Sequence, residues 1–210
     1  MVHYPAVQRV LVLRHGASTW NVEGRWQGWL DAPLTPEGEE QAAARARELA
    51  HGGVLPRAIY TSDLGRARRT AEILGAHLEC PVIPDEGLRE RHGGEWQGHT
   101  RSEIDSGWPG MREAWRRGEL SAPPGGEEND AVLARVDAAF TRALGHVGAG
   151  TLVVVTHHGV VRVLSMRAGI DPRTLIPNVG GYWFTVRYGR LLDPEPVDDL
   201  QPGPEYPATE

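Results

Sequence analysis

Two histidines in this 210-residue chain stand in the same local setting, shortly after an apolar run and shortly before a glycine. His15 follows the run 10–13, and His157 follows the run 151–155. Short apolar runs of this kind are typical of strands buried on both faces of a parallel sheet. Ligands bind outside the carboxyl ends of such strands, so both imidazoles face one pocket if the two strands are neighbours.

Two arginines are placed to hold an anion in the same pocket. Arg14 directly precedes His15, and Arg66 falls in the first turn of a helix expected to begin near Leu64. A planar guanidinium binds phosphate oxygens in pairs, and backbone N–H groups after a strand add further donors. All 22 basic residues are arginine, which excludes Schiff-base chemistry and the phosphate-binding lysines of P-loop proteins and kinases.

Strand and helix signals alternate along the chain, which predicts how these residues are positioned. Strands are expected at 10–13, 58–60, 151–155 and 182–186, and helices at 36–51, 64–77, 101–116, 129–146 and 160–168. The intervening stretch 85–125 is otherwise irregular and rich in Gly, Trp and Arg. The alternation predicts a single-domain, three-layer α/β/α fold with a mostly parallel central sheet.

The charge of the chain is unevenly distributed. The formal net charge is −6, and the last 18 residues hold six acids, five prolines and no base. We therefore expect a folded domain over 1–192 and an extended, largely unpacked acidic tail over 193–210. The remaining body is neutral, so no nucleic-acid footprint is indicated.

Other classes of protein are excluded by what the chain lacks. Cys80 is the only cysteine, so intrachain disulfides and thiol-rich metal sites are excluded. The longest apolar stretches are about six residues, against roughly 20 for a membrane span, and no signal peptide is recognisable. We expect a cytoplasmic protein with no membrane or nucleic-acid partner. The oligomeric state stays open, with a homodimer as one option.

Five blocks of sequence, in order, resemble the histidine phosphatase superfamily, which includes the cofactor-dependent phosphoglycerate mutases. The blocks are Leu11–Asn21, Gly24–Thr35, Ser62–Ala71, Leu88–Gly93 and Val155–Arg162. The resemblance implies a phosphoglycerate mutase-like fold and a phosphohistidine mechanism that needs no metal and no cofactor. It implies that His15 is the nucleophile and that Glu90 first protonates the leaving oxygen and then activates water. The phosphate-binding residues that it implies are Arg14, Asn21, Gln27, Gly28, Arg66 and His157. His158 stands where the family usually has glycine, and we expect its backbone N–H to face the phosphate, while the role of its side chain stays open.

Simpler interpretations exist for several of these residues. A histidine at a strand end is often structural, and Glu90 has Arg89 and Arg91 beside it as ion-pair partners. A metal site built from His15, His157 and His158 is disfavoured, because adjacent side chains of a strand point to opposite faces. A non-catalytic module that binds phosphorylated ligands or phosphoproteins is the alternative from another class.

Within the family, mutase and phosphatase features are mixed. Glu90–Gly93, Trp115–Arg117 and Pro123–Pro124 are similar to mutase elements, but the long mutase insertion after the proline pair is absent. Gly94–Gly98 matches the Gly-x-Trp-x-Gly element of the phosphatase branch. Losing a segment that excludes water favours hydrolysis. The sequence predicts a phosphomonoesterase for a small phosphorylated metabolite, with phosphoglycerate mutase as the alternative.

The substrate signal is an arginine pair on the helix expected over 101–116. Arg116 and Arg117 could bind a carboxylate of the substrate, or could belong to a solvated helix face. The stretch Leu88–Gly126 resembles glucosyl-3-phosphoglycerate phosphatases. Both interpretations of the arginine pair stay open at this point.

Overall fold

The computed structural model describes residues 7–148, 150–171, 174–187 and 189–197. One six-stranded sheet runs through this part of the chain in the order β3-β2-β4-β1-β5-β6. The elements in chain order are β1 Val7–Arg14, α1 Thr19–Glu23, α2 Pro36–His51, β2 Pro56–Thr61, α3 Gly65–Leu78, β3 Val82–Pro84, the 3₁₀ turns η1 Glu86–Leu88 and η2 Gly94–Trp96, α4 Arg101–Gly107, α5 Met111–Arg116, α6 Asn129–Val147, β4 Gly150–Thr156, α7 His158–Arg167, β5 Gly181–Arg187 and β6 Arg190–Pro196.

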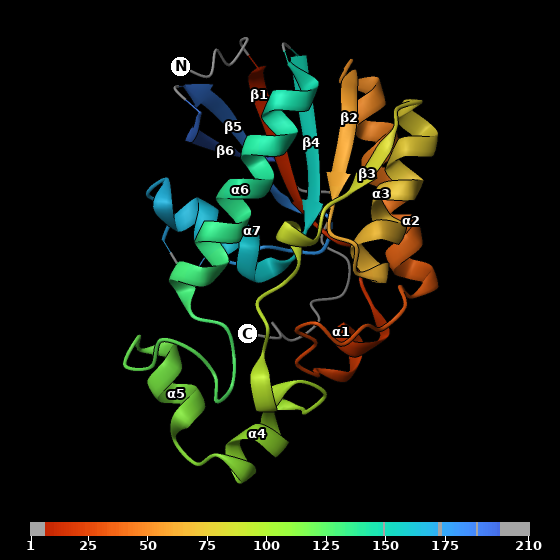
Figure 1. The fold of residues 1–210 in the computed structure, drawn as a ribbon. Coiled ribbons are helices and arrows are strands. Elements are labelled where there is room, and N and C mark those ends of the chain that lie inside the picture. The colour runs from red at the N-terminus through yellow and green to blue at the C-terminus, as the bar shows by residue number, and fades with distance from the viewer. Residues whose placement is uncertain (1–6, 149, 172–173, 188, 198–210) are drawn as a thin grey trace.

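The sheet is mostly parallel, as predicted. Strands β3, β2, β4 and β1 pair in parallel, and β5 and β6 are added in antiparallel orientation at one edge. Helices α2 and α3 lie on one side of the sheet and α6 and α7 on the other (Figure 1). The three-layer α/β/α architecture is therefore confirmed.

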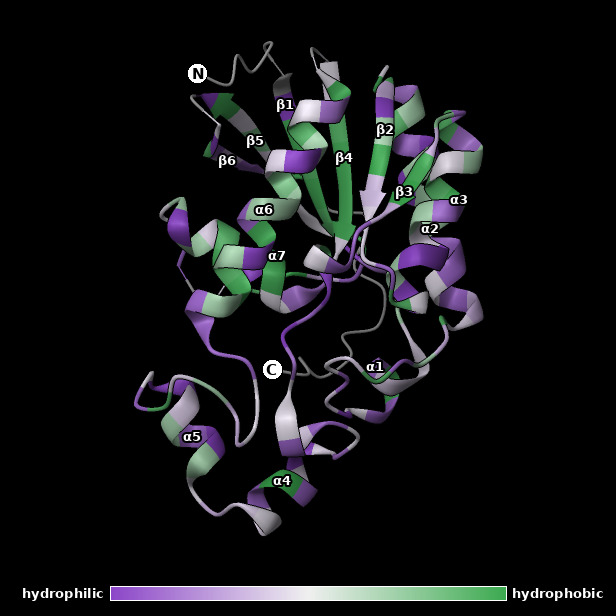
Figure 2. Ribbon diagram, viewed as in Figure 1, coloured by the Kyte–Doolittle hydropathy of each residue, from purple (hydrophilic) through white to green (hydrophobic). Residues whose placement is uncertain are grey.

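The apolar strand β1 shows why the sheet is buried on both faces. Val10 and Val12 pack in the cluster that contains residues of α6 and α7, and Leu11 and Leu13 pack in the cluster with α2 and α3. All four side chains are fully buried. Side chains of a strand alternate between its faces, so a strand covered on both sides must be continuously apolar. Figure 2 shows this as hydrophobic colouring along β1 and β4.

The helix expected over 101–116 is two short helices, α4 and α5. Trp108 ends α4, and Gly110 has a φ of 76°, in the left-handed region that favours glycine. Pro109 between them removes a backbone donor and restricts the residue before it. The expectation of one continuous helix is therefore wrong.

The first residues of the expected tail belong to the sheet. Strand β6 continues to Pro196 and pairs with β5, and the Val197 backbone N–H donates to the Gly181 carbonyl at 3.0 Å. Strand β6 lies at the sheet edge, where proline is tolerated because no further ladder bond is needed. The expectation of an unpacked segment is therefore wrong for 193–197, and residues 198–210 lie outside the described part.

A tryptophan cluster forms beyond the carboxyl ends of the parallel strands, where α4 and α5 lie (Figure 1). The Trp26 ring packs edge-on against Trp96 and Trp115, with 5.3 Å between ring centroids in both pairs. Trp96 and Ile104 are fully buried there. This cluster ties the irregular stretch after β3 to the loop after α1.

Candidate active site

The two strand-end histidines meet at one edge of the sheet. Strands β1 and β4 are neighbours with Arg14 opposite Thr156, and the His15 backbone N–H donates to the Thr156 carbonyl at 2.9 Å. The imidazole centroids of His15 and His157 are 5.2 Å apart, with the rings inclined by 63°. Because the two strands are parallel and adjacent, both rings lie together just beyond the carboxyl ends of β1 and β4.

A pocket of about 310 Å³ opens at this edge. It collects residues from the end of β1, from α1 and the loop after it, from the starts of α3 and α7, and from the segment after η1. The residues that line it are Arg14, His15, Asn21, Trp26, Gln27, Gly28, Arg66, Glu90 and His158. Eight of these nine were named from the sequence as site residues.

The protonation state of His15 follows from its contacts. Nδ1 lies 2.7 Å from the Gly16 carbonyl oxygen, which can only accept, so Nδ1 carries the proton and Nε2 keeps its lone pair. The side chain is buried, and burial, with the Arg66 and Arg14 guanidiniums beside it, holds the pKa of His15 well below 6.5. His15 is thus a neutral imidazole with a nucleophilic nitrogen.

His157 is fully buried at the N-cap of α7. Among the residues that the structure describes, neither of its ring nitrogens has a hydrogen-bond partner. Burial, with the Arg66 guanidinium and His15 as further causes, holds the pKa of His157 well below 6.5. An unsatisfied buried polar group costs about 1–3 kcal/mol, which an acceptor such as a phosphate oxygen would recover.

Each guanidinium in the pocket is fixed by protein oxygens. Arg66 donates to the carbonyls of Gly28 and Leu30 at 2.8 and 3.0 Å, and to the Asp31 carboxylate at 3.2 Å. Arg14 donates to the Ile176 carbonyl at 2.8 Å. A preorganised guanidinium stabilises developing charge without reorganising during the reaction.

Glu90 places its carboxylate across the N-terminus of α7. Its Oε2 accepts from the Gly159 N–H at 3.1 Å, and its Oε1 accepts from the Arg91 N–H at 2.8 Å. A Cβ at position 159 would come within 2.4 Å of Oε1, so only glycine permits this approach. The N-terminus of α7 and the backbone donors thus fix the Glu90 carboxyl group at the pocket wall.

The neighbouring arginines are engaged elsewhere, although the sequence left them open as partners of Glu90. The Arg89 guanidinium donates to the Asp63 carboxylate at 2.8 Å. The Arg91 guanidinium donates to the Glu127 carbonyl at 2.9 Å and also to the Asn129 side chain. The Arg91 backbone N–H donates to Glu90 Oε1 at 2.8 Å.

Neutral donors complete the wall. The Asn21 and Gln27 side-chain oxygens both accept from the Ser18 hydroxyl at 3.0 Å, which fixes the two amides side by side. Gly28 has a φ of 53°, and a Cβ there would collide with the Gln97 side chain. This turn brings the Gly28 carbonyl to Arg66.

Arg116 and Arg117 are not among the residues that line the pocket. Both are half-exposed on α5 or directly after it, and they form ion pairs with Glu113 and Glu119. The geometry therefore matches the solvated-face interpretation, and carboxylate binding by this pair stays a prediction.

Three positioning groups were not among the candidate residues from the sequence. Asp31 accepts from Arg66 and from the Gly65 backbone, the Ile176 carbonyl holds Arg14, and the Asn178 side chain donates to the His15 carbonyl at 2.9 Å. Asp31 lies inside a block that resembles the superfamily, which was a usable signal. Residues 176–178 have no periodicity or motif that could have indicated them.

No three or more His, Cys, Asp or Glu side chains gather as a metal site within the described residues. In that same part of the chain, none of the helices combines the length and the apolar character needed to span a membrane.

The fold and the pocket together define the class: α/β enzymes that act on phosphoryl groups. The chain matches the Histidine phosphatase superfamily (branch 1) over residues 10–179. A glucosyl-3-phosphoglycerate phosphatase from Mycolicibacterium vanbaalenii is 41% identical over 166 residues, covering 76% of this chain and 73% of the relative. A 2,3-bisphosphoglycerate-dependent phosphoglycerate mutase 2 from Gloeobacter violaceus is 36% identical over 165 residues, covering 75% and 74%.

A solved structure agrees with these sequence matches. The mycobacterial glucosyl-3-phosphoglycerate phosphatase in complex with VO3 superposes with a TM-score of 0.79 at 33% identity, covering 90% of this chain and 97% of that one. The chain belongs to the histidine phosphatase superfamily, and it is an enzyme of phosphomonoester hydrolysis.

Proposed function

We propose that this protein is a metal-independent phosphomonoesterase that works through a phosphohistidine on His15. The observation that carries the proposal is the neutral His15 ring, with its Nδ1 proton on the Gly16 carbonyl, in a pocket lined by Arg14 and Arg66. A neutral imidazole can attack phosphorus, and two guanidiniums supply the positive field that a metal ion supplies elsewhere.

The first chemical step breaks the ester bond. His15 Nε2 attacks phosphorus in line as the ester P–O bond breaks, and the leaving oxygen takes a proton from the Glu90 carboxyl group. Arg14, Arg66 and His157 hold the equatorial oxygens while charge redistributes. General acid catalysis of this kind contributes about 10²–10⁴-fold.

The second step releases phosphate. Glu90, now a carboxylate, accepts a proton from water, the water oxygen bonds to phosphorus, and the N–P bond to His15 breaks. The proton balance is closed, since Glu90 returns to its acid form and His15 to its neutral form. The buried position of Glu90 in the lining of the pocket supports its assignment to both proton transfers.

Hydrolysis is favoured over mutase activity by the short connection between α5 and α6. The Glu95 N–H donates to the Pro124 carbonyl at 2.9 Å, and the Glu127 N–H donates to the His92 carbonyl at 2.9 Å. This segment is therefore folded back against the stretch 92–95. A mutase must keep water from its phosphoenzyme, and a covering insertion is absent from the sequence here.

The substrate that we propose is a small phosphorylated metabolite, because a few polar and charged side chains converge on one pocket at the sheet edge. The glucosyl-3-phosphoglycerate phosphatase relative supports a substrate that carries a carboxylate. Cytoplasmic location and a homodimer stay predictions.

The proposal is tested by a phosphate-release screen over small phosphorylated metabolites, with and without a chelator. We expect turnover that the chelator leaves unchanged. An arm with 3-phosphoglycerate plus 2,3-bisphosphoglycerate measures isomer exchange, and exchange faster than phosphate release would make the protein a mutase. Tight phosphate binding with no turnover of any substrate would make it a binding module.

A further inference from the structure

We propose that Arg135 of α6 is a positioning residue that holds Glu90 in place for proton transfer. The inference rests on the proposed role of Glu90 as the acid and base. Arg135 does not line the pocket, and its guanidinium contacts the backbone carbonyls of the segment 87–90.

Arg135 uses all five of its N–H donors on the backbone of the segment 87–90 and on the Glu127 carboxylate. A guanidinium has five N–H groups. Nη1 donates to the Gly87 and Arg89 carbonyls at 3.0 and 2.6 Å, and Nη2 donates to the Glu90 carbonyl at 2.9 Å. The two remaining bonds go to the Glu127 carboxylate, from Nε at 2.7 Å and from Nη2 at 2.8 Å.

The Glu127 carboxylate also binds the backbone that follows Glu90. Its Oε2 also accepts from the His92 N–H at 3.2 Å. Burial alone would raise the pKa of Glu127, but the hydrogen bond from Arg135 and the positive charge of that residue outweigh it and lower the pKa. The pair is therefore charged, and it binds the backbone both before and after Glu90.

The segment needs such a hold because it has no ladder or helix of its own. Residues 89–93 lie between η1 and η2 in irregular backbone. Besides Arg135, the Trp29 Nε1–H reaches the Glu90 carbonyl, at 2.6 Å. The carboxylate contacts with Gly159 and Arg91 are set by where this backbone lies, so a shift of it moves the proton donor.

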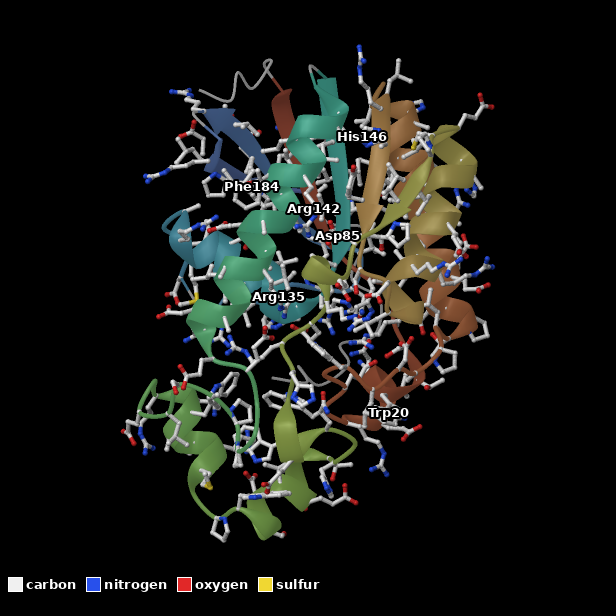
Figure 3. The ribbon with its side chains drawn as sticks, viewed as in Figure 1. Trp20, Asp85, Arg135, Arg142, His146 and Phe184 are labelled. Atoms are coloured by element: carbon white, nitrogen blue, oxygen red, sulfur yellow. The ribbon has the colours of Figure 1, made fainter. Side chains whose placement is uncertain are left out.

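Lysine cannot reproduce this arrangement. It has the same charge, but it has three donors on one nitrogen instead of five in a planar fork. Arg142 is the matched control, because it lies seven residues further along α6 and donates to both Asp85 oxygens, at 2.9 and 2.7 Å. Figure 3 shows Arg142 beside Asp85, with Arg135 lower in the view along α6.

The experiment compares two phosphomonoesters that differ in their need for an acid. 2,4-Dinitrophenyl phosphate releases 2,4-dinitrophenolate, a stable anion that needs no proton. Glycerol 2-phosphate releases an alkoxide, which must be protonated as the P–O bond breaks. We expect Arg135→Lys to lower kcat/KM about tenfold for glycerol 2-phosphate and less than about twofold for 2,4-dinitrophenyl phosphate. We expect Glu127→Gln to lower the ratio of kcat/KM for glycerol 2-phosphate to kcat/KM for 2,4-dinitrophenyl phosphate as well, and Arg142→Lys to leave this ratio unchanged.

The outcomes separate this inference from the proposed function. If Glu90→Gln discriminates between the two esters and both Arg135→Lys and Glu127→Gln lower them equally, Arg135 is only structural and the inference is overturned. If Glu90→Gln itself lowers both equally, Glu90 is not the acid, and its proposed role fails together with the inference, while the phosphohistidine on His15 is tested separately by isolating the phosphoenzyme. Glu127→Gln keeps the test decisive if Arg135→Lys does not fold, which circular dichroism reports.

Discussion

At the scale of single residues, the site depends on side chains that are fixed before substrate arrives. Arg66 is 1% exposed, and each of its hydrogen bonds named above goes to the loop 28–31. The His15 ring is oriented by the Gly16 carbonyl, and its backbone is held by Asn178. Such preorganisation is worth most in a water-poor pocket, where charges interact strongly.

A substitution of Asp31 tests whether Arg66 must be held in place before substrate binds. We expect Asp31→Asn to lower kcat/KM about tenfold, because it weakens a charge-assisted hydrogen bond that orients the phosphate clamp. Steady-state kinetics on one fixed ester measures it. Glu39→Gln, which weakens an exposed ion pair with Arg69, is the control. Equal kinetics of Asp31→Asn and the control would show that Arg66 is oriented without Asp31.

The sequence predicted individual residues correctly where the type of side chain and its position after a strand indicate a chemical role. The strand-end pairs Arg14–His15 and Thr156–His157 carry a recognisable pattern, and the structure brings both to the pocket edge. Ile176 acts through a backbone carbonyl, which every residue possesses, so its side-chain type gave no signal. Arg135 was indistinguishable in the sequence from other helix-face arginines.

At the scale of elements, the carboxyl end of β4 and the start of α7 form one functional unit. His157 follows the strand as the N-cap of α7, His158 lines the pocket, and Gly159 offers its N–H to Glu90. The turn combines a buried imidazole, a helix N-terminus and a position where a Cβ would crowd the Glu90 carboxyl group.

The glycine at position 159 tests this unit. Gly159→Ala places a methyl group within 2.4 Å of the Glu90 carboxylate, so we expect a loss of at least about tenfold in kcat/KM for alkyl phosphates. Gly145→Ala in α6 is the control, since nothing lies within 4 Å of its Cβ. Unchanged alkyl phosphate turnover in Gly159→Ala would show that Glu90 does not need this contact.

Most elements were predictable because their signals are local. The helix at 36–51 begins with a capping Thr35 and a proline, and its bounds match the structure. The break at Trp108–Gly110 was missed although it contains Pro109 and Gly110, two residue types that interrupt helices. Strand β6 was missed because acids and prolines at a sheet edge resemble an unpaired tail.

At the scale of the whole molecule, two neutral histidines are buried in the folded state and exposed to water on unfolding. The pKa values of His15 and His157 in the fold lie well below 6.5, with burial as the largest cause. Above pH 6.5 neither state binds the proton, so these groups make stability independent of pH there. Below pH 6.5 the unfolded chain binds protons that the folded protein does not, so the free energy of unfolding decreases as the pH is lowered.

The prediction is a free energy of unfolding that decreases from pH 6.5 to pH 5. Each buried histidine contributes up to about 1.4 kcal/mol per pH unit in that window. Urea unfolding at several pH values measures it. We expect a shallower slope in His157→Gln and an unchanged slope in His77→Gln, whose side chain is exposed on α3. An identical slope in the wild type and His157→Gln would contradict a buried, neutral His157.

The measurement that tests the central claim most directly is isolation of the phosphoenzyme. The protein is mixed with a ³²P-labelled phosphomonoester that it hydrolyses, and is denatured within milliseconds at alkaline pH, where a P–N bond survives. We predict label on the wild-type protein that is stable to base and released by acid, and no label on His15→Ala. Hydrolysis without any labelled protein, or label retained by His15→Ala, would contradict the phosphohistidine account.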